Sequence, residues 1–99
     1  MQATVTFTDD RARIALEGNF TYEAHRDFKQ ASTIALDNPA ARVLDIDFGK
    51  VEYMDSAALG MLLLLKERAV NRDMVLSHCT GTVLAVLNIA NFGRIFNIQ

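Results

Sequence analysis

The sequence predicts a small α/β domain, built on a mixed β-sheet of four to five strands with helices packed mainly on one face. Residues 3–8 and 13–17 alternate apolar and polar side chains, as strands with one wet face do, and the turn Asp9-Asp10 joins them. Residues 42–48 are mostly apolar, which is typical of a central strand. Segments of helical periodicity separate the later strands, so strands and helices alternate along the chain.

Length and composition agree with a single domain over residues 1–99. The chain is 51% hydrophobic and 22% charged, an ordinary globular composition. Its net charge of −2 leaves no basic excess for phosphates, so nucleic-acid binding is not expected. The single cysteine, Cys79, excludes an intramolecular disulfide and suits a reducing compartment. Since no segment resembles a membrane span or a secretion leader, we expect a cytoplasmic protein without direct membrane insertion.

The first two strands should form an antiparallel hairpin, because the connection between them is short. Gly18-Asn19-Phe20-Thr21 breaks the alternation, and Thr21 can cap the helix that follows. Apolar residues between Ala24 and Ala35 recur at helical spacing. Asn38-Pro39 is expected to end this helix.

The second half of the chain predicts a right-handed strand–helix–strand crossover that starts from strand 42–48. The loop that leaves this strand opens at its carboxyl end, where open α/β sheets place their functional sites. The elements expected after strand 42–48 are a loop over 49–54, a helix over 56–71, a strand over 73–78, a helix from Thr80 or Thr82 to about Ala90, a stop at Asn91-Phe92-Gly93 and a short extended tail over 94–98.

The segment Met54–Gly60, at the junction of this loop and helix, carries the functional signal. Ser56 immediately precedes a run of good helix formers, so it is a natural N-cap. A hydroxyl there is exposed, next to unpaired backbone N–H groups and the positive end of the helix dipole. Such a position accepts an added phosphate without unfolding the helix. The alternative is that Ser56 only caps the helix.

Five consecutive large apolar residues, Met61–Leu65, follow in the same helix. Five residues advance about 500° around a helix, so they cannot all face one sheet. Either a neighbouring helix covers the remainder, or they form an apolar patch that a partner covers. On both interpretations the first turn of the helix stays accessible, because the charged residues cluster at its other end. These are Lys66, Glu67, Arg68 and Arg72.

Val43–Asp47, a short loop and then Met54–Leu63 resemble the signature of the STAS domain, and more narrowly the stand-alone anti-sigma factor antagonists of bacteria. The resemblance covers nearly the whole chain, including the opening hairpin, the turn over residues 18–21 and the segment Ile89–Phe96. Ala57 and Ala58 depart from it, since the family often has a serine and a glycine there. Ser56 is therefore the only hydroxyl in the motif.

The resemblance implies partner switching in signal transduction and transcription regulation. In that family the unmodified antagonist binds an anti-sigma factor that has a histidine-kinase-like ATPase fold. This partner phosphorylates the serine that matches Ser56, the complex dissociates, and a metal-dependent serine/threonine phosphatase restores the binding form. The chain would then be a phosphoprotein and a binding module, not an enzyme, without cofactor or metal, and a monomer or weak dimer. The expected partner-binding residues are Asn19, Thr21, Asp55, Ser56, Ala57, Ala58, Leu59 and Gly60.

The acidic residues and Ser56 suggest two other kinds of chemistry. Asp45, Asp47 and Asp55 could suggest a Mg²⁺ site. We expect instead that Asp45 fixes the loop by accepting backbone N–H bonds and that Asp47 faces water. A hydrolytic role for Ser56 needs a base, and the Gly-x-Ser-x-Gly elbow is absent. The chain has two histidines, one expected on the first helix and one at a strand end, His25 and His78.

His78-Cys79 is one adjacent pair without further ligand-spaced cysteines, so a zinc site is not expected and Cys79 should be buried or half-buried. The runner-up function belongs to a different class. STAS domains also serve as accessory subunits of membrane transporters, where they dock on the ATPase subunit. The apolar helix over residues 57–65 would then be a permanent docking surface.

Overall fold

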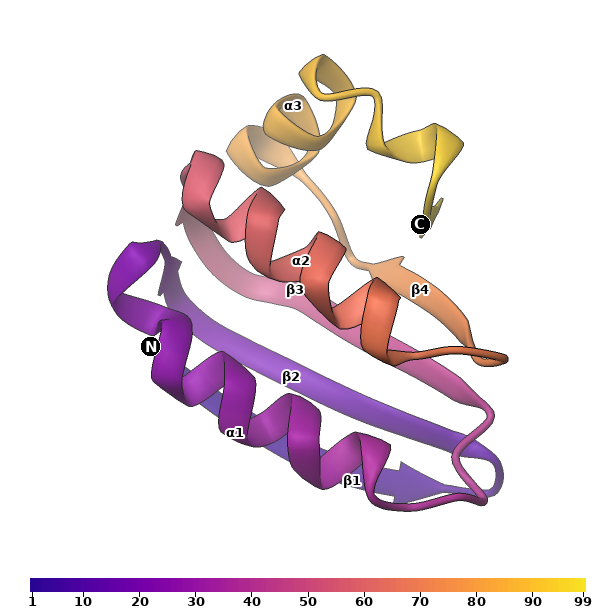
Figure 1. Cartoon of the computed structure of the whole chain (residues 1–99). Coiled ribbons are helices and arrows are strands. Elements are labelled where there is room, and N and C mark those ends of the chain that lie inside the picture. Colours follow the sequence, from indigo (N-terminus) through magenta and orange to yellow (C-terminus); the bar gives the residue numbers. More distant parts are fainter.

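The computed structural model describes every residue from Met1 to Gln99 and shows a five-stranded sheet with three α-helices (Figure 1). The strands follow one another across the sheet in chain order, with β1 antiparallel to β2 and every other pair parallel. This topology confirms the predicted mixed sheet with an N-terminal hairpin. The elements are β1 (Gln2–Thr8), β2 (Arg11–Phe20), the 3₁₀ helix η1 (Tyr22–Ala24), α1 (His25–Leu36), β3 (Val43–Met54), α2 (Ser56–Arg68), β4 (Asp73–Ser77), α3 (Gly81–Ile89), the 3₁₀ helix η2 (Phe92–Arg94) and β5 (Asn97–Ile98).

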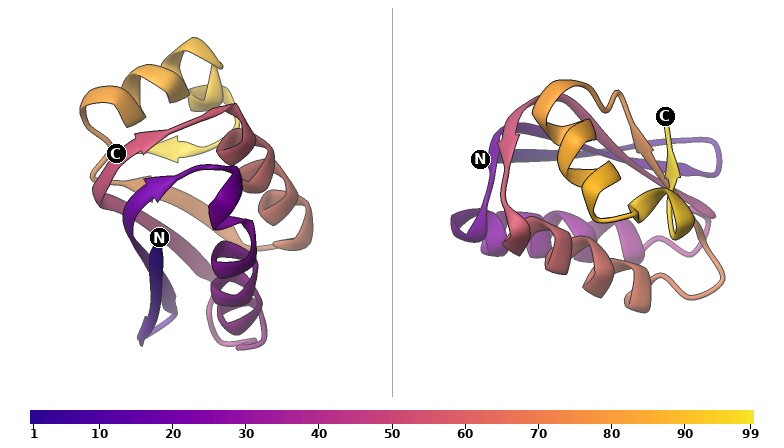
Figure 2. Two further views of the ribbon diagram at one scale, coloured as in Figure 1. Left: turned by 90° about the vertical axis from the view of Figure 1, so that its left-hand side faces the viewer. Right: turned by 90° about the horizontal axis from the view of Figure 1, so that it is seen from above.

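Helices α1 and α2 lie side by side on one face of the sheet, and α3 packs near the end of β3 beyond the start of α2 (Figures 1 and 2). The sheet alternates accordingly. On β2, Ala12, Ile14 and Leu16 point into the core and are at most 2% exposed. Arg11 and Arg13 point to the opposite face, which α1 and α2 leave uncovered. The structure contains no helix that could span a bilayer.

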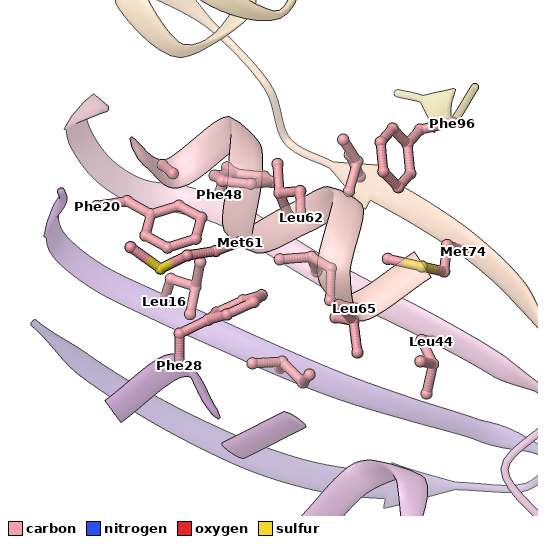
Figure 3. Close-up of a cluster of buried hydrophobic side chains, with 14 of the residues drawn as sticks. Leu16, Phe20, Phe28, Leu44, Phe48, Met61, Leu62, Leu65, Met74 and Phe96 are labelled. Atoms are coloured by element: carbon pink, nitrogen blue, oxygen red, sulfur yellow. The ribbon is translucent and has the colours of Figure 1, made fainter. Parts of the chain in front are cut away.

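One core joins the helices to the sheet (Figure 3). The Phe20 ring lies 4.9 Å from the Phe28 ring of α1 and 6.0 Å from the Phe48 ring of β3, measured between centroids. These aromatic contacts fix α1 over the point where β2 and β3 meet. The large side chains that complete this region are Leu16, Leu44, Met61, Leu62, Leu65, Met74 and Phe96.

The prediction of a loop over 49–54 was wrong, because β3 continues to Met54. Its second half pairs with the second half of β2, which also runs further than predicted, to Phe20. Irregularities in the pairing between Ala15 and Asn19 bend this part of the ladder. Most residues of 49–54 are exposed because β4 ends at Ser77 and leaves this part of β3 at the edge of the sheet. An exposed edge strand lacks the apolar pattern by which strands are recognised.

The remaining boundaries fall close to the predicted ones. Helix α1 ends at Leu36, just before the Asn38-Pro39 break, whereas α2 ends at Arg68, three residues earlier than predicted. Asn91 adopts the left-handed conformation, with φ 59°, as expected of a residue that stops a helix. The segment 94–98 is partly a strand. Its last residues form β5, which lies parallel to β4.

Candidate functional site

The ends of β2 and β3 bring the predicted site residues together. Asn19 pairs with Tyr53 and Phe20 with Met54, and the Asp55 N–H donates to the Phe20 carbonyl over 3.3 Å. The chain segments that flank Phe20 therefore lie against the segment that opens α2. Residues far apart in the sequence, at 19–21 and 55–60, share one end of the sheet (Figure 1).

Asp55, not Ser56, is the N-cap of α2. The Asp55 backbone is extended, and its Oδ1 accepts a hydrogen bond from the Ala58 N–H at 3.1 Å. Its Oδ2 accepts from the Tyr22 N–H at 3.3 Å, so one carboxylate ties the start of α2 to the 3₁₀ turn before α1. The prediction that Ser56 caps the helix was wrong by one residue, because the carboxylate reaches two backbone donors at once.

This arrangement leaves the Ser56 hydroxyl without a capping role. Ser56 is the first residue of α2, and its side chain is exposed. The free N–H groups of the first helical turn and the positive end of the dipole lie beside it. A modifying protein can therefore reach the hydroxyl without disturbing the core.

The other predicted partner-binding residues differ in exposure. Gly60 and Asn19 are exposed, Ala57 and Leu59 are half-buried, and Ala58 is fully buried. Ala58 therefore contributes packing under the first turn, while its neighbours on α2 form the accessible surface. Thr21 is half-buried, and its side chain makes no capping bond to the 3₁₀ turn that it precedes.

A shallow apolar groove of about 430 Å³ runs from the start of α2 along the side that faces η1 and α1. The run Met61–Leu65 divides between core and surface. Leu63 is 39% exposed and Leu64 is 55% exposed, whereas the other three residues are buried. Tyr22, 75% exposed, forms the opposite wall. Tyr22 was not among the predicted partner-binding residues. Its position directly after Thr21, which was predicted, is the sequence feature that could have identified it.

Gly60 lies inside α2, where the fold itself gives no reason for a glycine. A Cβ built at this position meets no other atom within 4 Å, and the backbone has an ordinary helical conformation. A glycine in a helix interior destabilises the helix by about 1 kcal/mol relative to alanine. Because Gly60 has no side chain, nothing projects from the outer surface of α2 at this position, which lies beside the groove and one turn from Ser56.

From the sequence, Asp45 was expected to fix the loop after strand 42–48 by accepting backbone N–H bonds, and this prediction was wrong. Asp45 is instead the centre of a charge cluster on the sheet face opposite α1 and α2. Its carboxylate is 1% exposed and accepts hydrogen bonds from Arg11 Nη1 at 3.0 Å, Arg13 Nη2 at 3.1 Å and the Ser77 hydroxyl. The register explains this cluster, because Arg13 pairs with Asp45 across β2 and β3. Asp47 lies two residues on and accepts from His78 Nδ1 at 2.9 Å.

These surroundings shift the pKa values of two side chains, Asp45 and Cys79. Burial raises the pKa of Asp45, but the hydrogen bonds from Ser77, Arg11 and Arg13 outweigh it, so its pKa lies below the ordinary 3.8. Burial, assisted by the negative charge of Asp47, raises the pKa of Cys79 to about 11. The buried thiol is therefore protonated at neutral pH and has little nucleophilic character.

Comparison with known proteins places the chain in a family. The model of the family described as "Mlab, STAS domain" matches residues 3–98. The chain belongs to the STAS domain family. A STAS-domain containing protein of Pseudomonas aeruginosa (strain UCBPP-PA14) is 38% identical over 88 residues, which cover 87% of this chain and 85% of that protein.

Solved structures share the fold over almost the whole length. An anti-sigma factor antagonist from Mycobacterium paratuberculosis superimposes with a TM-score of 0.88 at 17% identity, covering 99% of this chain and 84% of that one. Unphosphorylated SpoIIAA, an anti-sigma factor antagonist, gives 0.74 at 17% identity over 98% and 86%. A sulfate transporter family protein from Wolinella succinogenes gives 0.70 at 16% identity over 86% and 70%. At these identities the likeness establishes the STAS fold.

Proposed function

We propose that this STAS domain is an anti-sigma factor antagonist that acts by partner switching. Its unphosphorylated form binds a serine kinase of the anti-sigma factor class, with a histidine-kinase-like ATPase fold, and phosphorylation of Ser56 ends the binding. The observation that carries the proposal is the free, exposed Ser56 hydroxyl at the first residue of α2. The anti-sigma factor antagonists among the structures with the same fold support this choice of class.

The charge that a phosphate adds at Ser56 is large enough to disrupt an interface formed there. A phosphoserine adds about −1.5 to −2 charge at pH 7. Asp55 is adjacent, so the local charge approaches about −3. A partner that packs on the apolar groove would have to desolvate this charge. A loss of only about 3–4 kcal/mol weakens binding several hundred-fold.

The switch requires no refolding of the domain. Asp55 holds the start of α2 through two backbone N–H groups that the Ser56 side chain does not use. A phosphate on Ser56 therefore leaves the cap in place and changes only the surface that the partner meets. In the proposed cytoplasmic cycle a metal-dependent serine/threonine phosphatase removes this phosphate, and the domain serves as substrate and binding module without catalysing a reaction.

The test is affinity capture from extract of the source cells with the wild type, Ser56→Ala and Ser56→Asp. Gln30→Glu is the matched control, because it adds one negative charge to an exposed position of α1. The wild type, Ser56→Ala and Gln30→Glu should retain a kinase of the histidine-kinase-like class, and Ser56→Asp should lose it. Equal capture of the same proteins by the wild type and all three variants would contradict the proposal.

A permanent docking role on the ATPase subunit of a membrane transporter is the second candidate. The exposed apolar side chains Leu63, Leu64 and Ile89 favour it, since a constitutive interface would cover them. A transporter-family protein also has the same fold. A phosphate-sized mass increase mapped to Ser56 in protein from cells supports the switch, whereas constitutive co-purification with a transporter ATPase and no modification supports docking.

A further inference from the structure

The two edges of the sheet are built differently. At one edge, β5 has two residues. At the other, β1 has seven, Gln-Ala-Thr-Val-Thr-Phe-Thr, without a charge or a proline. β1 has β2 as its only sheet neighbour, and no other element lies beyond it in the left view of Figure 2. Proteins commonly protect an edge strand by shortness, charge, proline or a bulge. β5 is protected by its shortness, whereas β1 has a straight, unbroken pairing register and none of these features.

The apolar face of the sheet is incompletely covered along β1. The core-facing residues of the neighbouring β2 are at most 2% exposed, but Ala3 and Val5 are only half-buried and Phe7 is 44% exposed. α1 packs over β1 and runs back toward the turn after Thr8. Its Ile34 is 55% exposed. The apolar layer therefore continues to the edge and ends there uncovered.

The sequence of β1 is complementary to itself when two copies run antiparallel about an axis through Val5. Val5 then meets Val5, and Phe7 meets the small Ala3 on the core-facing side. On the other side Thr4 meets Thr6, and threonine pairs directly opposite each other are favourable cross-strand neighbours. No like charges face one another, because the strand carries none. An isologous contact of this kind closes as a dimer and does not propagate.

We propose that a second copy of this chain pairs with the first through β1, antiparallel, to give one continuous sheet of ten strands across a two-fold axis. Backbone N–H and C=O groups of alternate β1 residues supply the hydrogen bonds, and the uncovered edge of the apolar layer supplies the buried area. The interface is small, so the dimer is weak. Because β2 separates β1 from the strand that leads into α2, both Ser56 sites stay open, and the inference is independent of the proposed switch.

Sedimentation velocity up to about 1 mM protein, where weak dimers still assemble, tests the proposal. Thr4→Lys/Thr6→Lys places like charges directly opposite each other across the axis, twice, and should weaken association at least about tenfold. Thr4→Glu/Thr6→Glu should do the same. An equimolar mixture of the two variants should associate again, because each introduced lysine then faces a glutamate. Thermal melts confirm that each variant is folded, since Thr6 also neighbours Arg13 of its own chain.

Leu64→Lys is the control, because Leu64 is exposed and belongs to α2, a helix that lies over β3 and not over β1 (Figure 1). It should leave the dimer intact. In hydrogen exchange, alternate amides of residues 2–8 should become protected as the wild-type concentration rises. A wild type that stays monomeric, double lysine variants that dimerise normally, a mixture that does not re-associate, or a dimer lost in Leu64→Lys would each overturn the proposal. Monomers that bind only a foreign extended peptide along β1 would also overturn it.

Discussion

The molecule contains two aspartate–serine combinations, and they have opposite environments. Asp45 and Ser77 lie on adjacent strands and are bonded to each other, 1% and 6% exposed, with two arginines on the same carboxylate. Asp55 and Ser56 are adjacent in the chain, and there the carboxylate bonds backbone N–H groups while the hydroxyl is exposed. In the first combination, the carboxylate and the hydroxyl are both engaged in hydrogen bonds within the folded domain.

The difference shows which of the two can act as a switch. A hydroxyl that donates to a buried carboxylate cannot be modified without breaking a charge cluster. A hydroxyl next to a cap that is already complete can be modified with little effect on stability. We therefore expect substitutions in the Asp45 cluster to change stability, and substitutions around Ser56 to change binding.

Asp45→Asn should have the largest effect on stability. It keeps the shape but removes the charge that accepts from Arg11, Arg13 and Ser77. We expect a loss of about 2–3 kcal/mol in the free energy of unfolding at pH 7, below the value for a fully buried ion pair because both guanidinium groups reach water. Urea denaturation measures it. An unchanged midpoint would show that the cluster does not stabilise the fold.

The pH dependence of stability, measured for the wild type and Asp45→Asn, tests the same charge cluster. The pKa of Asp45 is lowered in the folded chain, so its ionised form stabilises the fold. This contribution is complete above the ordinary pKa of 3.8, which applies to the unfolded chain, and is lost as pH falls through the lower folded pKa. The stability gap between wild type and Asp45→Asn should therefore narrow below about pH 4. A gap that stayed constant from pH 7 to acid pH would contradict the assignment.

Asp55→Ala should have an intermediate effect on stability and also weaken partner binding. It removes the acceptor for the Ala58 and Tyr22 N–H groups. Loss of an N-cap costs about 1–2 kcal/mol, and the start of α2 should fray. Thermal unfolding measures the loss of stability, and amide exchange at residues 56–58 measures the fraying. Asp55→Asn, which keeps an oxygen acceptor, is the control and should lose less; equal losses would place the effect outside the cap.

Gly60→Ala separates stability from binding. Because a Cβ meets nothing within 4 Å, alanine should stabilise the domain by about 0.5–1 kcal/mol through helix propensity and reduced unfolded-state entropy. Gly60→Leu should fold as well, but the larger side chain should reduce capture of the partner by obstructing the face next to the groove. Undiminished capture by Gly60→Leu would remove this face from the interface.

Ser56→Asp should have the smallest effect on stability. A negative charge in the first turn of a helix is favourable by about 0.3–1 kcal/mol, and repulsion from Asp55 opposes it. We expect the melting temperature to stay close to that of the wild type, in contrast to Asp45→Asn. A large drop in melting temperature would indicate that a charge here acts by unfolding α2.

Much of the fold could be predicted because its elements carry strong local patterns. The hairpin alternates, strand 42–48 is apolar, and Asn38-Pro39 and Asn91 end helices as expected. The second half of β3 could not be predicted, because its strand character comes from pairing with a distant part of β2 and not from its own pattern. The partners of Asp45 were missed for the same reason. They come from β2 and β4, and only the register brings them together.

The N-cap of α2 was predictable to within one residue. The motif identified the start of α2 correctly, but a sequence cannot show which of two adjacent capping residues reaches the backbone donors. Asp55 takes that role because η1 offers a second N–H, at Tyr22, within reach of the same carboxylate. This contact crosses 33 positions of the chain. It is also what frees the Ser56 hydroxyl.

The central claim is tested most directly by titrating the captured kinase-class partner with two purified forms of the domain, unmodified and phosphorylated at Ser56. Isothermal titration calorimetry gives both dissociation constants, and a melt of each form shows that both are folded. The account predicts that the phosphorylated form binds several hundred-fold more weakly at an unchanged melting temperature. Equal dissociation constants for the two forms would contradict it.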